Sequence, residues 1–395
     1  GLLPVSLKRH RPGTISGQDP QVVFNIHNMS DVVYQGGWFD PELLAYAGLP
    51  KSLFRRGPVR HRGQVNFIKA GIVFSDRVNT VSEGYAREIS SGQAEAFVTL
   101  DGARKRFKCS GGLDRVWTRY QVNLVGVRNG IDDAYDPASI GEGEDWQFVD
   151  QDWTSSYAPA QGQSIAGWAY SADDPALGRK KQDLKCYLQE RCNRFLNTRL
   201  KVGAEIPVIA VRSRLTEQKG FDLIIRALRQ CRPDLPVQFI IVAWGEQRYA
   251  GHLKQLAAAN PEWLAFSESW KVAPEPLHYT GADMLLMPSL FEPCGLPHMM
   301  ALRYGTIPIV RNTGGLADVV GDFDPKSGVG NGFVFDAPSS GEMLRAVGRA
   351  LETYHHRPDH WRALLKTAMR ARDRKGDDFA WTTAAGRYVA ELYRF

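Results

Sequence analysis

The chain has 395 residues, of which 43% are apolar, and its 49 Lys and Arg against 43 Asp and Glu give a formal net charge of +6. This composition is typical of a folded globular protein and excludes global disorder, and the length suggests two or three domains of about 100–200 residues each. No uncharged apolar run reaches the roughly 18 residues that a membrane-spanning helix needs, so the sequence predicts no membrane span.

The N-terminal half, residues 1–200, shows few regular elements. A well-patterned helix is predicted over Val65–Phe74. The convincing strands are Val22–Ile26, Arg77–Val81 and Gln121–Val127. A doubly wound domain usually has about six strands, and the chain begins with Gly1 rather than Met. We therefore expect this acceptor-side domain to be incomplete, with a short native form or cleavage of a longer precursor as the alternatives.

Residues 137–178 form an unusual acidic segment between the two halves. The segment contains seven acidic residues, no Lys or Arg, and the tryptophans Trp146, Trp153 and Trp168. We interpret it as an inter-domain linker with aromatic anchors on the surface. The alternative is a lid that contacts carbohydrate, because indole faces stack on sugar rings. A charged helix, Lys180–Leu196, is predicted to lead into the second domain.

Residues 203–375 are predicted to form one complete doubly wound α/β domain, because strands alternate with helices along this stretch. The predicted strands are Ile206–Val211, Val237–Ala243, Asp283–Pro288, Thr306–Val310 and Gly332–Phe335. The predicted helices are one from about Phe221, Tyr249–Asn260 and Leu296–Arg303. Residues 376–395 contain a last amphipathic helix, Trp381–Tyr393, which is expected to cross back to the first domain.

Several of these strand ends carry residues suited to a nucleotide-diphosphate donor. Arg214 and Lys219 follow the first strand of the second domain, where a guanidinium fork and an ammonium can hold phosphate oxygens. Glu292 lies in a turn before a helix, where a carboxylate can accept hydrogen bonds from sugar hydroxyls. Thr313-Gly314-Gly315 repeats this arrangement as a second anion-cradling turn. Ligands bind at the carboxyl ends of strands in open α/β sheets, so we expect these residues to converge on one crevice.

Longer motifs surround these residues and follow one another along residues 22–336. In the first half they are Ile26-His27-Asn28, Tyr34-Gln35-Gly36, Asn66 to Gly71, Asn79 to Ser82, Tyr85 to Ile89 and Asn129 to Asp132. In the second half they are Ser213 to Thr216, Gln218 to Gly220, Phe291 to Leu296, Ala301 to Thr306 and Thr313 to Asp318. In these motifs the chain resembles the bacterial glycogen synthase and plant starch synthase family. The resemblance implies the GT-B architecture, in which two Rossmann-like doubly wound domains enclose a cleft.

The resemblance also implies an activity and the roles of individual residues. The reaction would move glucose from ADP-glucose or UDP-glucose to the non-reducing end of an α-1,4-glucan with retention of configuration. Arg214 and Lys219 would bind the donor diphosphate, Glu292 would hold the glucosyl hydroxyls, and His27 would bind the glucose near the reacting carbon. No metal or other cofactor is implied, because the cations neutralise the charge.

The remaining site residues divide between the two substrates. The donor-side residues that the resemblance implies are Cys294, Gly295, Leu296, Thr313, Gly314, Gly315, Asn129 and Trp270, the last as the aromatic that stacks on the base. On the acceptor side, it implies Asn28, Tyr34 and Gln35.

The sequence departs from the family at several positions. Nothing before Val22 resembles the family's Lys-x-Gly-Gly-Leu loop, Pro297 stands where Thr is usual, and Leu290 replaces Arg. The turn Ala243-Trp244-Gly245-Glu246 replaces Gly-x-Gly-Asp. The donor base, adenine or uracil, therefore stays open. The alternative function is a non-catalytic or truncated family member that binds glucan or nucleotide without turnover.

Charge and cysteine patterns bear on partners and location. The basic clusters are Lys8 to Arg11, Arg55-Arg56, Arg60 to Arg62 and Arg104 to Arg106. We interpret them as solvated surface, with binding of an anionic ligand or polymer as the alternative, and nucleic-acid binding is not expected because no stacking aromatics interleave them. Five scattered cysteines without a Cys-x-x-Cys pair favour an intracellular, reducing compartment, either cytoplasm or plastid.

Overall fold

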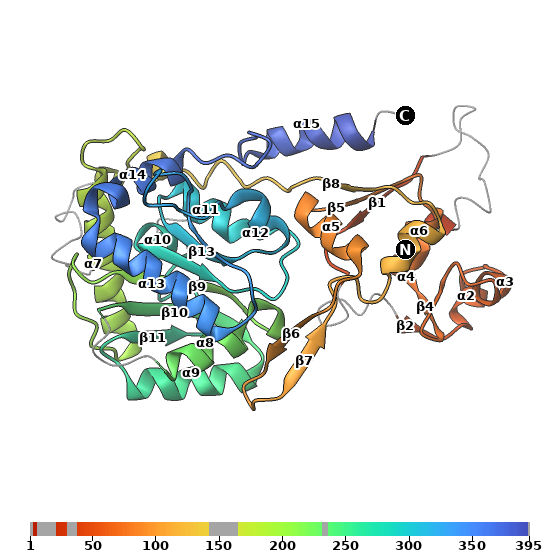
Figure 1. Ribbon diagram of the computed structural model, residues 1–395, viewed down its shortest axis with the longest axis horizontal. Helices are drawn as coiled ribbons and strands as arrows, with labels where there is room; N and C mark the ends of the chain where they lie inside the picture. Colours follow the sequence, from red (N-terminus) through yellow and green to blue (C-terminus); the bar gives the residue numbers. More distant parts are fainter. Residues whose placement is uncertain (1–2, 6–20, 30–37, 142–164, 231–235, 394–395) are drawn as a thin grey trace.

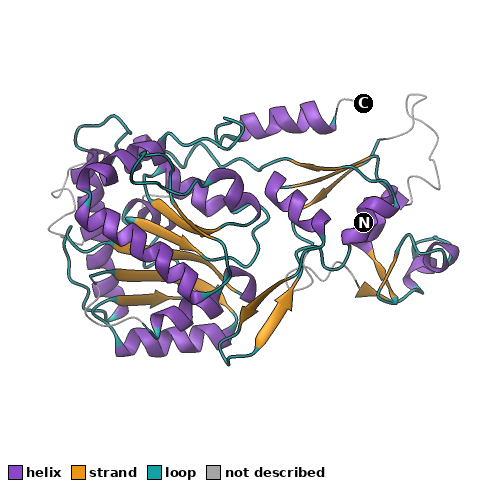
Figure 2. Ribbon diagram, viewed as in Figure 1, coloured by secondary structure: helices purple, strands orange, loops and turns teal. Residues whose placement is uncertain are grey.

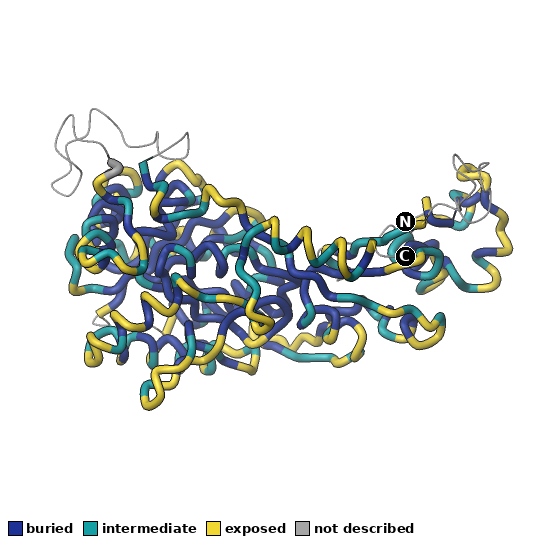
Figure 3. The backbone as a smooth tube through the Cα atoms, turned by 90° about the horizontal axis from the view of Figure 1, so that it is seen from above, coloured by how far each residue is buried: buried dark blue, intermediate teal, exposed yellow. Residues whose placement is uncertain are grey.

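The computed structural model describes residues 3–5, 21–29, 38–141, 165–230 and 236–393. Two α/β parts lie side by side along the long axis, with the larger C-terminal part at the left of Figure 1 and the smaller N-terminal part at the right. One hydrophobic core cluster runs through both parts, from Ile26 to Phe379. Figure 3 shows buried segments filling the larger part and continuing into the smaller one. The two parts therefore share a packed boundary.

The larger part is built on a six-stranded parallel sheet with the strand order β11-β10-β9-β12-β13-β14. Its strands are β9 (Val208–Leu215), β10 (Gln238–Gly245), β11 (Leu264–Ser267), β12 (Met284–Met287), β13 (Ile307–Arg311) and β14 (Phe333–Phe335). The sheet is covered on both faces, which explains why its strands are continuous apolar runs in the sequence. The five strands predicted here are confirmed, whereas β11 was not predicted.

Helices cover both faces of this sheet (Figure 2). They are α7 (Leu177–Leu196), α8 (Phe221–Leu228), α9 (Gln247–Ala259), α10 (Glu275–Thr280), α11 (Leu296–Arg303), α12 (Gly314–Val319), α13 (Ser340–His356) and α14 (Pro358–Met369). Helix α8 packs between α9 and α13, and α10 packs between α7 and α11. The expected doubly wound fold is confirmed. Among the described residues, no helix combines the length and the apolar character needed to cross a bilayer.

The smaller part contains a three-stranded parallel sheet in the order β1-β5-β8 within the described residues. Its strands are β1 (Val23–Ile26), β5 (Arg77–Thr80) and β8 (Leu124–Gly126), and its helices are α4 (Phe67–Phe74), α5 (Glu83–Ser91) and α6 (Asp114–Arg119). All three predicted strands are confirmed. The predicted helix at Val65 begins later, because Asn66 caps α4 by accepting a 2.8 Å hydrogen bond from the Lys69 N–H.

Further short elements were not predicted. They are β2 (Trp38–Phe39), α2 (Leu43–Tyr46), α3 (Ser52–Arg55), β3 (Arg60–His61), β4 (Gln64–Asn66), η1 (Pro137–Ser139) and η3 (Ile165–Trp168). Of these, η1 and η3 pack near the larger part. The antiparallel hairpin β6 (Glu95–Val98) and β7 (Arg104–Phe107) reaches the larger part, where Lys105 pairs with Glu217 of η4 (Glu217–Lys219) at 2.6 Å. Arg104 and Arg106 are exposed, as expected for solvated surface.

The C-terminal helix and the acidic segment have different environments. Helix α15 (Trp381–Leu392) lies against the smaller part, where Arg387 pairs with Glu83 at 3.2 Å. In the acidic segment, Trp146 and Trp153 lie outside the described residues. Trp168 is 4% exposed and packs on Tyr187 with ring centroids 5.1 Å apart. Trp168 therefore serves as a packing anchor and is not available to stack on a sugar.

A buried histidine makes stability depend on pH. His278 in α10 is fully buried, and its Nε2 lies 3.1 Å from the Ile240 carbonyl oxygen. Burial, aided by the nearby Arg212 cation, lowers the pKa of His278 to about 3. Below pH ~6.5 the unfolded chain therefore binds a proton that the folded chain does not, and folding loses about 1.4 kcal/mol per pH unit.

We expect the wild-type chain to lose about 2 kcal/mol more free energy of unfolding between pH 7 and pH 5 than the His278→Gln chain. Urea denaturation at both pH values measures this difference. Equal losses in the two chains would show that His278 gains its proton in the folded state as well.

Candidate active site

Glu292 lies in the turn between β12 and α11, and its carboxylate is held from two sides. Its side chain is 6% exposed. The Oε2 atom lies 2.6 Å from the Lys219 ammonium and accepts a 2.9 Å hydrogen bond from the Ser289 hydroxyl. Within the described residues, Oε1 accepts no hydrogen bond. One oxygen is therefore fixed, and the other remains available to a ligand hydroxyl.

The loop after β9 brings Lys219 to Glu292. Gly220 has φ +75°, and a Cβ there would lie 2.2 Å from the Pro288 carbonyl oxygen, so only glycine allows this approach. Gln218 joins this loop to the turn after β12, because its backbone carbonyl accepts a hydrogen bond from the Leu290 N–H at 2.8 Å. The ion pair thus results from adjacent parallel strands, β9 and β12, which end at the same edge of the sheet.

Cys294 and Gly295 complete the turn. Gly295 has φ +82°, and a Cβ there would lie 2.8 Å from the Glu292 Cγ, so the turn requires glycine. Burial raises the pKa of the Cys294 thiol to about 12, although a hydrogen bond from the Asn129 backbone opposes the shift. The thiol is therefore neutral at physiological pH. This contact also brings Asn129 of the smaller part to the turn that follows Glu292.

The Thr313-Gly314-Gly315 turn lies beside the Glu292 turn, and its donors have protein partners. The Gly315 N–H donates to the Glu292 carbonyl at 2.9 Å. The Gly314 N–H and the Thr313 hydroxyl both donate to Glu88 Oε1, at 2.7 and 2.8 Å. The predicted convergence of this turn with Glu292 is observed. Its role as an anion cradle stays a prediction, because a carboxylate of the first part occupies it here.

The other predicted site residues are exposed or half-buried, or lie outside the described residues. Arg214 is exposed at the end of β9 beside Trp244 of β10, its register partner. Trp270 is 58% exposed after β11. His27 is exposed at the carboxyl end of β1, and neighbouring Asn28 accepts from the Tyr85 hydroxyl at 3.4 Å. Leu296, the first residue of α11, is half-buried, and Tyr34 and Gln35 lie outside the described residues.

Sequence reasoning missed three polar residues beside this site. Ser82, Glu88 and Asp318 lie within the quoted motifs, but no role was assigned to them. All three make hydrogen bonds across the boundary between the two parts. The only local signal was Ser82, which caps α5 by accepting from the Tyr85 N–H at 3.1 Å. The partners across the boundary are more than 200 residues away in sequence and could not be predicted locally.

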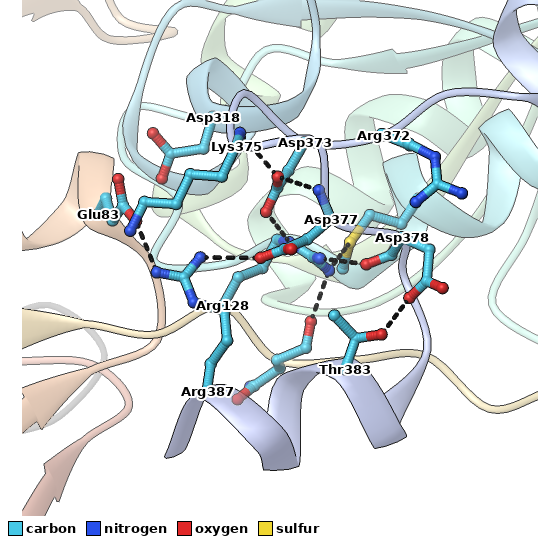
Figure 4. A network of polar contacts seen from close by, with 12 residues as sticks. Glu83, Arg128, Asp318, Arg372, Asp373, Lys375, Asp377, Asp378, Thr383 and Arg387 are labelled. Atoms are coloured by element: carbon cyan, nitrogen blue, oxygen red, sulfur yellow. Dashed lines mark hydrogen bonds and ion pairs between the residues drawn. The ribbon is translucent and has the colours of Figure 1, made fainter. Parts of the chain in front are cut away.

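A network of ion pairs flanks the site where α15 crosses the boundary (Figure 4). Arg387 of α15 pairs with Glu83 at 3.2 Å and with Asp377 at 3.1 Å. The buried Arg128, which follows β8, pairs with Asp373 at 3.3 Å. Except for Asp377, these charged side chains line a cavity of about 230 Å³. The network fastens α15 and the preceding loop to the first part.

Comparison with known proteins identifies the family. Residues 1–105 match the starch synthase catalytic domain, and residues 199–363 match glycosyl transferases group 1. Glycogen synthase from Thermotoga maritima is 35% identical over 399 residues, which cover 100% of this chain and 69% of that protein. The chain belongs to the starch and glycogen synthase family of glycosyltransferases. A further member, glycogen synthase 1 from Methylococcus capsulatus, is 37% identical over 379 residues, 95% of this chain and 65% of that protein.

Solved structures of glycosyltransferases confirm the GT-B fold of this family member. The catalytic domain of starch synthase IV from Arabidopsis thaliana, bound to ADP and acarbose, is 26% identical and superposes with a TM-score of 0.72 over 99% of this chain and 69% of that chain. Sucrose-phosphate synthase from Thermosynechococcus elongatus, 16% identical, shares the fold with a TM-score of 0.50 over 95% of this chain and 68% of that chain. The chain spans about two-thirds of the length of these proteins.

Proposed function

We propose that this glycosyltransferase moves glucose from a nucleotide-diphosphate sugar to the non-reducing end of an α-1,4-glucan, with retention of configuration. The observation that carries the proposal is the Lys219–Glu292 ion pair at the carboxyl ends of adjacent strands. It joins a cation suited to phosphate with a carboxylate suited to sugar hydroxyls. Membership of a family that includes glycogen synthases supports the same reaction.

The positive charge for the leaving diphosphate comes from two side chains in this proposal. The Arg214 residue is exposed, and no hydrogen bond or ion pair joins its guanidinium to another described residue. Lys219 has three N–H donors and uses one on Glu292, which leaves donors for phosphate oxygens. Such preorganised charge stabilises the negative charge that develops on the departing group. No metal or other cofactor enters the proposal, because these cations supply the neutralisation.

The sugar would lie between Glu292 and the edge of the smaller part. Glu292 Oε1 would accept a hydrogen bond from a glucosyl hydroxyl, since Oε2 is already bound to Lys219 and Ser289. Asn129, which contacts the turn at Cys294, would lie on the other side of the sugar. His27 and Asn28 follow β1 at the same boundary, so we infer that the glucan approaches from this side.

We propose ADP-glucose as the first candidate donor and UDP-glucose as the second. Trp270 is 58% exposed after β11, where an indole face can stack on a base. The solved starch synthase IV domain, a relative at 26% identity, is described as bound to ADP and acarbose, which supports an adenine nucleotide. Stacking alone accepts either base, so the assay must compare both donors.

A second candidate function is binding of nucleotide or glucan without turnover. Pro297 lies in the first turn of α11 and supplies no N–H there. The Gly314 N–H, a second candidate donor for phosphate, is bound to Glu88. These two features reduce the number of backbone donors that face a diphosphate.

Incubation with ADP-glucose and UDP-glucose, with and without glycogen, separates the candidates. We expect glycogen-dependent release of nucleoside diphosphate with at least one donor, and added glucose that α-amylase removes. Saturable binding of nucleotide or glycogen without release of diphosphate would favour the second candidate and contradict the first.

A reducing compartment is part of the proposal. The cysteines that the structure describes, Cys109, Cys186, Cys192 and Cys294, are buried, and no disulfide joins any two of them. Buried thiols outside disulfides are compatible with cytoplasm or plastid, where thiols stay reduced.

A further inference from the structure

Helices α5 and α12 face each other across the boundary and exchange hydrogen bonds reciprocally. The Gly84 N–H, in the first turn of α5, donates to Asp318 Oδ2 of α12 at 2.7 Å. The Gly314 N–H, at the start of α12, donates to Glu88 Oε1 of α5 at 2.7 Å. Each helix thus supplies a carboxylate that accepts a backbone N–H from the start of the other helix. At a helix start, such N–H groups have no partner within their own helix. Charge-assisted bonds of this kind are stronger than neutral ones.

Two glycines bring the backbones of this contact together. A Cβ on Gly84 would lie 2.2 Å from the Gly314 carbonyl oxygen. A Cβ on Gly314, which has φ +45°, would lie 2.0 Å from the Glu292 carbonyl oxygen. Neither position has room for a side chain, and the obstacle in each case is backbone. Helix α5, the Gly314 turn and the Glu292 turn are therefore stacked in direct contact.

Hydrogen bonds from α5 continue to both sides of Glu292. Glu88 fixes the turn at Gly314, whose neighbour Gly315 donates to the Glu292 carbonyl at 2.9 Å. On the other side, the Ser82 hydroxyl donates to the Pro293 carbonyl at 2.5 Å. The Pro293 carbonyl is thus bonded directly to the first part of the chain, and the Glu292 carbonyl is linked to it indirectly, through the turn that Glu88 holds.

The carboxylate of Glu88 uses one oxygen for its two bonds. Oε1 accepts from the Gly314 N–H and from the Thr313 hydroxyl, whereas Oε2 is buried and accepts no hydrogen bond from described residues. An amide oxygen can make the same two bonds. The contact therefore depends on an acceptor at this position and does not require a second oxygen.

We propose that Glu88 and Ser82 are positioning residues, which hold the Glu292 turn in its working geometry from the opposite side of the domain boundary. The inference rests on the proposed function, since the working geometry is that of the sugar site. Glu88 touches neither the Glu292 carboxylate nor Lys219, and it acts through the Gly314–Gly315 backbone. Displacements of about 1 Å at a reacting centre can cost a hundredfold in rate, so loss of this support should appear in kcat.

The test compares Glu88→Ala with Glu88→Gln, and Asp322→Ala is the matched control. Asp322 also accepts a backbone N–H, from Val334 of β14 at 2.7 Å, and its carboxylate pairs with Arg349 of α13 at 2.8 Å. We expect Glu88→Ala to lower kcat about 10- to 100-fold while donor KM changes less than threefold. Glu88→Gln should recover kcat to within about fivefold of wild type, and Asp322→Ala should leave it within twofold.

Hydrogen exchange of the same proteins tests the contact without relying on turnover. We expect Glu88→Ala to lose protection of the amides in residues 313–316, and Glu88→Gln and Asp322→Ala to keep it. Unchanged exchange in Glu88→Ala, or equal kcat losses in Glu88→Ala and Glu88→Gln, would overturn the proposal. If the wild-type chain shows no turnover, the proposed function fails, and the exchange result alone decides whether Glu88 holds this turn.

Discussion

Replacement of Glu292 by glutamine is expected to lower glycogen-dependent turnover by about a hundredfold or more while the protein stays folded. Glutamine has nearly the same size and keeps an oxygen for the Ser289 hydroxyl, which lies 2.9 Å from the carboxylate. It removes the negative charge beside Lys219 and the charged acceptor for the sugar hydroxyls. The measurement is kcat with saturating donor and glycogen, together with the melting temperature.

Glu217→Gln is the matched control for this prediction. Glu217 is 5% exposed, pairs with Lys105 at 2.6 Å and belongs to the same β9–α8 connection as Lys219. It is thus a second buried carboxylate paired with a lysine, but it faces the β6–β7 hairpin rather than the sugar site. Turnover of Glu217→Gln should stay within about threefold of wild type. Equal losses in both variants would mean that Glu292 has only a structural role.

The second large effect concerns the two cations, Arg214 and Lys219. Because Arg214 is exposed and Lys219 is largely buried, their variants should lose similar activity but differ in stability. Arg214→Met should lower kcat/KM for the donor about a hundredfold or more, because a charge facing the diphosphate is lost. Arg214 is exposed, so its loss should change the free energy of unfolding by less than about 0.5 kcal/mol. Lys219→Met should cause a similar loss of activity and also destabilise the fold by about 1–3 kcal/mol, because it leaves the Glu292 carboxylate without its cation.

Arg199→Met is the control for these two variants. Arg199 is 72% exposed and pairs with Glu262 on the surface, away from the Glu292 turn. Its substitution should alter neither kcat/KM nor stability. The assignment of Arg214 would be wrong if Arg214→Met kept kcat/KM within threefold of wild type.

Local patterns predicted much of the larger part because its elements are long and regular. The apolar runs of β9 and β10 and the helical spacing from Phe221 lead directly to a parallel sheet with helices on both faces. Strand ends then place Lys219 and Glu292 at one edge, and the structure brings their side chains to 2.6 Å. The roles of the two residues stay predictions.

The short strands and the hydrogen bonds across the domain boundary could not be predicted, because they depend on contacts between segments that are distant in the sequence. Strand β2 has two residues, which is too short for a periodic signal. The bond from Gly314 to Glu88 joins positions 226 residues apart, and it requires the relative placement of two domains. No local pattern in the sequence distinguishes a glycine turn that cradles a phosphate from one that receives a carboxylate of the same chain.

Glycogen-dependent release of nucleoside diphosphate by the wild-type chain, with Glu292→Gln and Glu217→Gln assayed beside it, is the most direct test of the central claim. The structure predicts release with ADP-glucose or UDP-glucose that glycogen stimulates, that falls about a hundredfold in Glu292→Gln and that persists in Glu217→Gln. Folded wild-type protein that releases no diphosphate with either donor, or equal release by Glu292→Gln, would contradict it.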